Sequence, residues 1–506
     1  MKAPTAGQGS TAKGSALAEV WPLSPLQEGL LFHADFDGQG RPDIYTVQSV
    51  LSVDGPLDAA RLRAAWQTLL DRHPALRASF HRRATGEAVQ LIMREATLPW
   101  TEADLSDRTE PAADAEFDRL VRAERDRRID PAVAPLLRLL LVRRDARHHR
   151  LVLTSHHILL DGWSLPVLLD ELGTVYEAKG DPSSLAPVTS YRDYLAWLAR
   201  QDKEAARAAW RAELDGAEEP TLVAATATAQ PGSGSPRRRS VHLCAETTAA
   251  LTDLARARGL TLNTVVQGAW ALVLARLTGR TDVVFGATVA GRPPELPGAE
   301  TAVGLFINTV PVRVRLDGAQ PLDRMLAELQ DRQGALMAHQ HLGLADIQGA
   351  VGPAASFDTL LVYENYPRSR RPAPDPGAVT FSSLEARQAT HYPLSVGIAP
   401  DERLRVDVTY HPGLIEEQLG EALGGIVARV LEQLAQDPTA PVGRLGVLTG
   451  PERGLVLEGW GATAGGVPGG LVPELVAGRV RVSPGAVALS EGDLSMTYEE
   501  LWAASG

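Results

Sequence analysis

The sequence predicts a mixed α/β fold, an α+β sandwich in each of two comparable halves that meet near residues 195–210. In both halves, apolar runs of strand length alternate with amphipathic helical segments. No internal repeat with a period of about 20 to 50 residues is visible, which excludes a solenoid or a propeller. The 506 residues, 44% of them apolar, allow about three domain-sized units.

The first half follows a leader, residues 1–16, which is small, polar and without periodicity. Residues 57–73 predict an amphipathic helix that starts at Asp58 and stops before Pro74. We expect this helix to cover a sheet with an apolar face made of Leu62, Trp66, Leu69 and Leu70.

Two strand-length runs, 136–142 and 151–157, predict a β-hairpin. The charged octet between them contains His148 and His149, and we expect it to be the solvated tip. After Trp163 the apolar period changes to about 3.6 residues, which predicts a helix.

The second half is expected to contain a flexible loop at 225–240, whose Arg237, Arg238 and Arg239 face water. Helices are predicted at 261–279 and around 415–435. Strands are predicted within 282–292, 303–316, 357–367 and 404–412. Residues 451–506 differ in composition from the rest of the chain. They predict a Gly-rich linker, one short helix, one hairpin and the start of another helix, and we expect the chain to stop inside a further domain.

Composition narrows the function classes. The net charge of -12, from 62 acidic and 50 basic residues, disfavours a nucleic-acid partner. No apolar run reaches the ~18 residues of a membrane span and no export signal is visible, so we expect a cytoplasmic protein without a membrane partner. The only cysteine, Cys244, has no second cysteine and no nearby histidine at metal spacing, so we expect neither a disulfide nor a metal site.

The most informative stretch is TSHHILLDGWS at 154–164, where an apolar strand runs into a helix. Adjacent side chains of a strand point to opposite faces, so only one of His156 and His157 can face a cleft. Asp161 would be costly to bury without a cationic or hydrogen-bonding partner. Gly162 permits a turn and the close approach of a substrate to the backbone.

From these residues alone, a catalytic imidazole and a structural polar cluster stay open as alternatives. The chain has no G-x-S-x-G serine, no H-E-x-x-H, no Walker-type Gly-Lys-Ser/Thr and no G-x-G-x-x-G after a strand. A hydrolase triad, a zinc site and a nucleotide site are therefore unsupported.

The stretch SHHILLDGWS resembles the HHxxxDG core of the condensation domains of nonribosomal peptide synthetases, in the chloramphenicol-acetyltransferase-like superfamily. Other stretches agree in order and spacing over residues 20–450. They are WPLSPLQEGLLFHA, RHPALRASF, YRDYLAWL, VAGRPPELPG, VGLFINTVPVRV, LVYENYP and THYPLSV. The tail, from GWGATAGGVPG to LSMTYEEL, resembles the linker and start of an adenylation domain.

The resemblance implies two acyltransferase-like lobes, 17–198 and 199–450, in a V-shaped pseudo-dimer with a tunnel at the interface, followed by the adenylation-like tail at 451–506. Donor and acceptor carrier proteins would dock at the two mouths, each inserting a phosphopantetheine arm. The acceptor amine would attack the donor thioester and form a peptide bond. The domain would need no metal and no cofactor of its own, and the excised piece is expected to be monomeric.

The same resemblance assigns roles to the motif. His157 is the expected active-site histidine, and Gly162 lies close to the reacting groups. His156 is expected to be structural, and Asp161 to pair with an arginine. The candidates for that arginine are, in order of preference, Arg292 and Arg77. The residues proposed as tunnel lining are Asn308 and Thr309, for which sheet packing is an equal alternative, and Trp163 and Ser164.

Several readings stay open at this point. Whether His157 is a general base or orients substrates and stabilises the intermediate is undecided, because an α-amine with a pKa of roughly 8 is already partly neutral near pH 7. An epimerization domain shares the HHxxxDG motif, but it ordinarily ends a module. A heterocyclization domain has aspartate in place of His156, and a non-catalytic docking member of the fold commonly lacks the active-site histidine. A free-standing acyltransferase that uses coenzyme A thioesters is disfavoured by the adenylation-like tail.

Overall fold

The computed structural model describes residues 16–36, 44–224, 236–367, 378–387, 390–461, 469–492 and 494–505. The chain divides into two compact units, residues 1–447 and 448–506. Three expected segments lie wholly or mostly outside the described residues. They are the leader at 1–16, the loop at 225–240 and the Gly-rich linker at 462–468.

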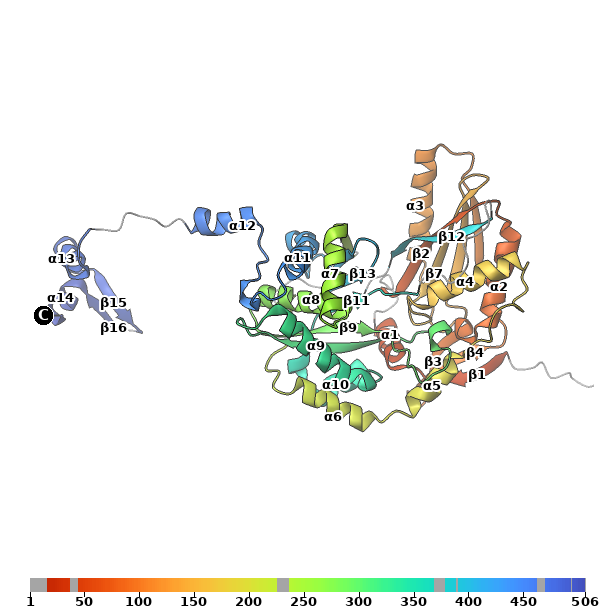
Figure 1. Ribbon diagram of the computed structural model, residues 1–506, viewed down its shortest axis with the longest axis horizontal. Coiled ribbons are helices and arrows are strands. Elements are labelled where there is room, and N and C mark those ends of the chain that lie inside the picture. Colours follow the sequence, from red (N-terminus) through yellow and green to blue (C-terminus); the bar gives the residue numbers. More distant parts are fainter. Residues whose placement is uncertain are drawn as a thin grey trace, which may run out of the picture. The chain divides into compact units, whose positions relative to one another are not determined.

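The first half of the larger unit is built on a five-stranded sheet with the order β12-β2-β7-β6-β5 (Figure 1). Its strands are β2 (Thr46–Asp54), β5 (Trp100–Asp104), β6 (Leu137–Arg143), β7 (His148–His156) and β12 (Thr380–Arg387). The predicted hairpin is confirmed, because β6 and β7 pair antiparallel. β12 comes from the second half of the chain and pairs antiparallel with β2, so the two halves share a sheet.

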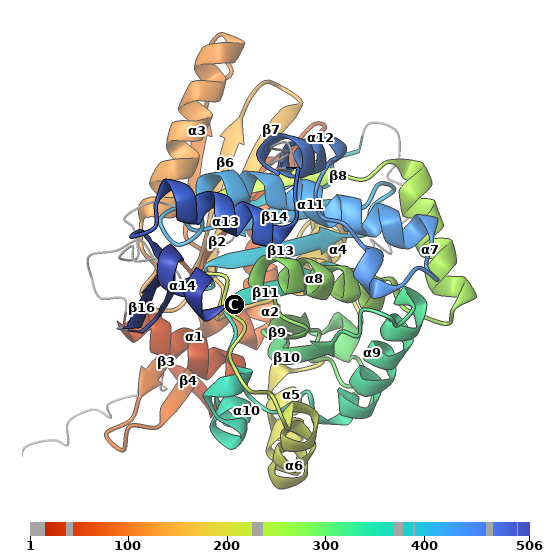
Figure 2. The same ribbon diagram turned by 90° about the vertical axis from the view of Figure 1, so that its left-hand side faces the viewer.

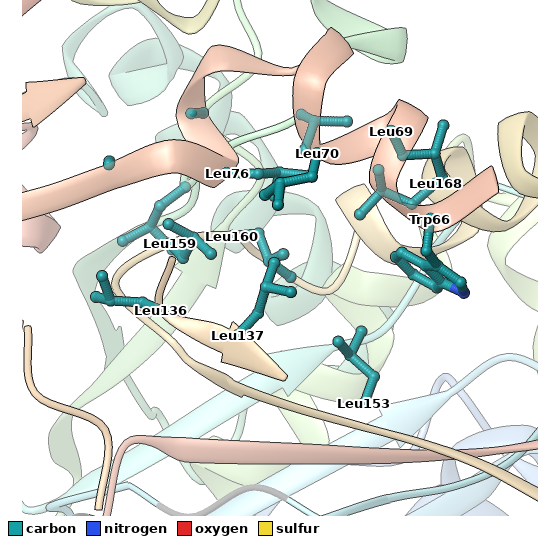
Figure 3. Packing of buried hydrophobic residues seen from close by; sticks show 14 of the residues in the cluster. Trp66, Leu69, Leu70, Leu76, Leu136, Leu137, Leu153, Leu159, Leu160 and Leu168 are labelled. Carbon is teal, nitrogen blue, oxygen red and sulfur yellow. The ribbon is translucent and has the colours of Figure 1, made fainter. Parts of the chain in front are cut away.

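The alternation of side chains along this sheet buries both of its faces. On one face, Leu139, Leu151 and Leu153 pack in the same apolar cluster as α2 (Ala59–Arg72) and α4 (Ser164–Glu177). Figure 3 shows Trp66 and Leu69 of α2 and Leu168 of α4 above Leu153. The opposite face, with Leu140, Val142 and Val152, packs against α3 (Glu110–Asp126). The predicted N-cap of α2 is confirmed, because the Asp58 carboxylate accepts from the Arg61 N–H at 3.0 Å.

The second half is built on a six-stranded sheet with the order β10-β9-β11-β13-β14-β8 (Figure 2). Its strands are β8 (Arg237–His242), β9 (Asp282–Val289), β10 (Asn308–Arg315), β11 (Thr359–Tyr363), β13 (Leu394–Ala399) and β14 (Arg405–Tyr410). One large apolar cluster packs the sheet against α7 (Ala245–Ala257), α8 (Leu262–Thr278), α9 (Leu322–Leu336) and α11 (Glu417–Gln436). A further cluster contains residues of α6 (Lys203–Leu214) and α10 (Leu344–Val351). The mixed α/β fold with two sheet-based halves is thus confirmed.

Helix α8 matches the predicted segment 261–279 closely. It ends at Gly279, whose φ of 70° is the left-handed conformation that a glycine adopts without strain. Among the described helices none is by itself long and apolar enough to cross a membrane. The pair α7 and α8 meets that test together by length and composition, with a bend of 109° between them.

The remaining elements are smaller. The first half also contains a three-stranded sheet, whose strands in order are β1 (Leu17–Trp21), β4 (Ala88–Met93) and β3 (Ala78–Arg82). The helices α1 (Pro25–Phe36) and α5 (Tyr191–Ala199) also belong to the larger unit. The smaller unit contains α12 (Gly450–Gly454), α13 (Val472–Val482), the hairpin β15 (Val487–Glu491) and β16 (Leu494–Thr497), and α14 (Tyr498–Ala504).

Two predictions about charged stretches need correction. Residues 237–239 form part of edge strand β8 and not a loop, although their arginine side chains are exposed as expected. Each arginine has a carboxylate partner on α11 or β14. The pairs are Arg237 with Glu417, Arg238 with Asp407, and Arg239 with Glu421. His149 was expected in water, but β7 already begins at His148, and strand alternation turns His149 inward to an exposure of 7%.

The strand predicted within 303–316 begins only at Asn308. The residues before it pack into the core of the first half instead of continuing the second sheet. They are Ala302, Val303, Leu305 and Phe306. This crossing segment and β12 are two places where the second half of the chain contributes to the first half.

Candidate active site

Strand β7 carries the motif histidines to the seam between the two halves. β7 ends at His156, and the His157 N–H still donates to the Tyr45 carbonyl at 2.8 Å. His156 is fully buried, and its Nδ1 accepts a hydrogen bond from the Ile158 N–H at 3.1 Å. His157 is half-buried and lines a cavity. This is the division between an interior and a cleft-facing histidine that strand alternation predicts.

The loop that follows β7 fixes the orientation and the tautomer of the His157 ring. Nδ1 lies 3.2 Å from the Leu160 carbonyl oxygen, which only accepts, so Nδ1 carries the proton of the neutral ring. The lone pair is then on Nε2. Burial lowers the pKa of His157 below its ordinary value, although Asp161 opposes the shift, so the ring is neutral near pH 7. A neutral imidazole at a cavity wall is suited to accept a proton or a hydrogen bond.

Two adjoining cavities lie at this seam. The first has a volume of about 450 Å³, and His157, Gly162 and Trp163 line it from the first half of the chain. The second has a volume of about 940 Å³ and is lined in part by Asn308. Both cavities share the lining residues Leu26, Leu30, Tyr45, Thr309, His391 and Tyr392. The cavities therefore meet at a wall of mainly apolar and aromatic side chains.

Asp161 ties the motif loop to the second half of the chain. Its fully buried carboxylate accepts from Arg292 Nη2 at 3.0 and 3.3 Å and from the Phe306 N–H at 3.0 Å. The Ser164 hydroxyl and N–H donate to it at 2.8 and 2.9 Å. The Arg292 guanidinium lies 4.1 Å from the centre of the Phe306 ring and donates to the Ala302 carbonyl at 2.8 Å. Removing one partner from such a buried ion pair is strongly destabilising, so the pair holds the loop geometry.

Arg292 is thus the arginine that pairs with Asp161, and the second candidate, Arg77, is wrong. Its guanidinium donates to the carbonyl oxygens of Leu70 and Met93 at 2.8 and 3.0 Å, and these backbone acceptors lie within the first half. Ser164 as a tunnel-lining residue is also wrong. It is fully buried against Asp161 and the Gly304 carbonyl, and it lines neither cavity.

The other proposed lining residues do reach the cavities. Trp163 lines the first cavity, and its indole N–H donates to the Glu300 carbonyl at 2.9 Å. Thr309 lines both cavities. Asn308 lines the second cavity and also holds the chain, because its amide donates to the carbonyls of Gln340 and Leu342 at 2.9 and 2.8 Å.

Gly162 has no room for a side chain. A Cβ added there would lie 2.3 Å from the hydroxyl oxygen of Tyr366 and 2.5 Å from Cζ of the same ring. Tyr366 comes from the segment after β11 and lines the first cavity together with His157. Burial raises the pKa of Tyr366, so its hydroxyl stays protonated near pH 7. Gly162 was expected to let a substrate approach the backbone closely, but in the structure it is Tyr366 that lies against this glycine.

Sequence reasoning missed Tyr45, Tyr366 and His391. The Tyr45 hydroxyl and His391 Nδ1 are 2.6 Å apart across the seam, and the His391 ring stacks on His33 with centroids 4.5 Å apart. Burial lowers the pKa of His391 to about 4, so its ring is neutral near pH 7. The available signal was indirect, because Tyr366 and His391 stand in LVYENYP and THYPLSV, two stretches of the resemblance to which no role was given.

Comparison with known proteins agrees with this architecture. The family model described as "Condensation domain" matches residues 17–455. Linear gramicidin synthase subunits C and D of Brevibacillus parabrevis are 35% and 34% identical, over 96% and 95% of this chain. The chain spans only 6% and 10% of the length of these two relatives.

Among solved structures, the first condensation domain of the calcium-dependent antibiotic synthetase, in complex with a substrate analogue, superposes with a TM-score of 0.71 at 25% identity. The match covers 85% of this chain and 100% of that one. The chain therefore belongs to the condensation-domain family of nonribosomal peptide synthetases.

Proposed function

We propose that this chain joins a donor aminoacyl or peptidyl thioester to the amine of an acceptor aminoacyl thioester, both carried on phosphopantetheine arms of carrier proteins. The observation that carries the proposal is a neutral imidazole, His157, in the wall of the first of two adjoining cavities at the seam of the two halves. Two adjoining chambers suit a reaction between two tethered substrates, since each arm has its own chamber and the arms meet beside the imidazole.

The proposed reaction is an aminolysis of the donor thioester. The acceptor nitrogen attacks the donor carbonyl carbon, a C–N bond forms and the C–S bond breaks. The donor's thiolate leaves and takes up the proton that the nitrogen releases. Nε2 of His157 either carries that proton between the two groups or orients the amine by accepting a hydrogen bond from it. Tyr366, as a protonated hydroxyl in the same cavity, is placed to support the developing negative oxygen.

Other parts of the proposal concern the context of the domain. We assign residues 17–198 and 199–450 to the two lobes, 1–16 to a leader and 451–506 to a linker with the start of an adenylation domain. Carrier proteins are the proposed partners on both sides, and the adenylation domain is the proposed neighbour downstream. We place the protein in the cytoplasm, as a monomer when excised, without a metal or a cofactor of its own.

The test is a reconstitution with two loaded carrier proteins. The chain is mixed with a donor and an acceptor carrier, and the acceptor is analysed by mass spectrometry. A dipeptidyl thioester on the acceptor that requires the chain supports the proposal, and its absence contradicts it.

The same assay, run in deuterated water, examines the epimerization alternative. Exchange of the donor's α-proton for deuterium without peptide would support epimerization. Binding of a carrier or another protein with neither peptide nor exchange would support a docking role. The retained His157 and its place in a cavity wall favour chemistry over docking.

A further inference from the structure

The two cavities at the seam differ in charge. Among the described residues that line the first cavity there is no Asp, Glu, Lys or Arg. The second cavity is lined by Glu28, Lys203 and Asp346 in addition to neutral residues. The contrast places ionisable carboxylates and an ammonium in one chamber, while the chamber of His157 holds only neutral groups near pH 7.

Several amides and hydroxyls of the first wall are hydrogen-bonded to one another or to Gln267, which is buried behind the wall. Gln267 donates to Asn263 Oδ1 at 3.2 Å, and Gln333 donates to Gln267 Oε1. The Thr264 hydroxyl donates to Gln330 Oε1 at 3.1 Å. These neutral dipoles are held by their neighbours, so turning one toward a charged ligand would break an existing hydrogen bond.

Two charged residues next to the lining in sequence, Asp161 and Glu364, are paired with other groups, and Asp331, next to Gln330, is exposed to solvent. Asp161, next to Gly162, is buried with Arg292 at 3.0 Å. Glu364, between the lining residues Tyr363 and Asn365, lies 3.8 Å from an Arg405 nitrogen. A charged substrate group in the first cavity would therefore lose hydration without meeting a counterion, which is unfavourable.

We propose that the first cavity accepts an aminoacyl chain whose side chain is uncharged and discriminates against one that carries a carboxylate or an ammonium group. This inference rests on the proposed function, because it assigns a substrate class to the same site. It applies to whichever of the two substrates, donor or acceptor, places its side chain in this cavity.

The test uses isosteric pairs of residues on the carrier-bound thioesters. Glutamine is compared with glutamate, and 2-aminoheptanoic acid, whose pentyl side chain matches lysine in length, is compared with lysine. Each comparison is made first on the donor with a neutral acceptor and then on the acceptor with a neutral donor. At one or both positions the charged forms should react at least about tenfold more slowly than their neutral isosteres. Charged forms that react within about threefold of the neutral ones at both positions would overturn the inference.

A substitution in the wall identifies the cavity as the cause. Gln333→Glu is isosteric and adds one negative charge. At the position that discriminates, the rate with lysine relative to 2-aminoheptanoic acid should rise by about tenfold, and the rate with glutamate relative to glutamine should fall further. Unchanged ratios in this variant would contradict the assignment. The matched control is Gln418→Glu on α11, which is exposed and lines neither cavity, and its ratios should stay those of the wild type.

The outcomes also separate this inference from the proposed function. If the all-neutral pair gives no peptide with the wild-type chain, the proposed function fails and the inference fails with it. If the neutral pair gives peptide and the charged forms do so equally well, only the inference fails.

Discussion

A pair of adjacent histidines stands at each end of strand β7, and of these four residues His157 lines a cavity. At the hairpin end, His148 is exposed and lies 2.8 Å from Asp145, while His149 is buried. At the other end, His156 is buried and His157 faces the first cavity. Alternation divides both pairs in the same way. The difference lies in what stands opposite the outward histidine, which is solvent at one end and the second half of the chain at the other.

The largest expected effect is the loss of peptide formation in His157→Ala. Removing a group that accepts or orients a proton should lower the rate about 10²- to 10⁴-fold. The reconstituted carrier assay measures this rate, and circular dichroism checks that the fold is intact. His148→Ala, at the hairpin end, is the control and should retain the wild-type rate. A His157→Ala variant that keeps most of its activity would remove this histidine from the mechanism.

The next effect concerns the ion pair beside each histidine pair. Arg292→Met leaves the Asp161 carboxylate buried without its cation and should lower the free energy of unfolding by about 3–5 kcal/mol, measured by urea denaturation. Arg143→Met removes an exposed partner of Asp104 at the hairpin end and should change the stability much less. Equal losses in the two variants would show that the buried pair contributes no more than the surface pair.

A smaller effect is expected from Gly162→Ala. The added methyl would meet the Tyr366 ring, so the ring must move within the first cavity, and we expect a rate about tenfold lower. The double variant Gly162→Ala with Tyr366→Ala removes the clash but also the hydroxyl. Rate recovery in it would assign the loss to the clash, and a further loss would assign a role to the hydroxyl. The control is Gly425→Ala on α11, where no neighbouring atom lies within 4 Å of the added Cβ, and it should leave the rate of peptide formation unchanged.

The smallest effect is a change in acid sensitivity. Burial is the main cause that lowers the pKa of His149 below 6.5, so the unfolded chain binds more protons as the pH falls below 6.5. The stabilisation that comes from keeping His149 buried and neutral is therefore complete above pH 6.5 and is lost as the pH falls below that value. His149→Gln should reduce the loss of unfolding free energy between pH 7.5 and pH 5, because it removes one of several histidines with lowered pKa. An unchanged slope in His149→Gln would contradict the assignment.

The local part of this site was predictable from the sequence. Two apolar runs of strand length around a charged octet predicted the hairpin of β6 and β7, and the alternation of side chains along a strand predicted that one histidine of the motif faces inward. The pairing of Asp161 with Arg292, which are 131 residues apart, came only from the resemblance to a family. Local spacing carries no information about contacts at such separations, which is why Tyr366 over Gly162 and His391 beside Tyr45 were missed.

Charge misjudged the exposure of one stretch and the secondary structure of another. The octet between β6 and β7 predicted a solvated tip, but the strand starts within it and alternation then buries His149. The arginines at 237–239 predicted a loop, but carboxylates of α11 and β14 allow them to form an edge strand. In both cases the composition of a short segment did not reveal its surroundings in the fold, which are a buried sheet face for His149 and carboxylates for the arginines.

Strand β12 belongs to the second half of the chain but pairs with β2 of the first half, and this pairing bears on how substrates could enter the site. β12 pairs with β2 from Thr380 opposite Asp54 to Arg387 opposite Gln48, so main-chain hydrogen bonds bridge the seam on that side. Separating the halves there would break this ladder, which costs far more than sliding a flexible arm along its length. Under the proposed function, substrates would therefore reach His157 along the two cavities and not through a gap opened between the halves at β12.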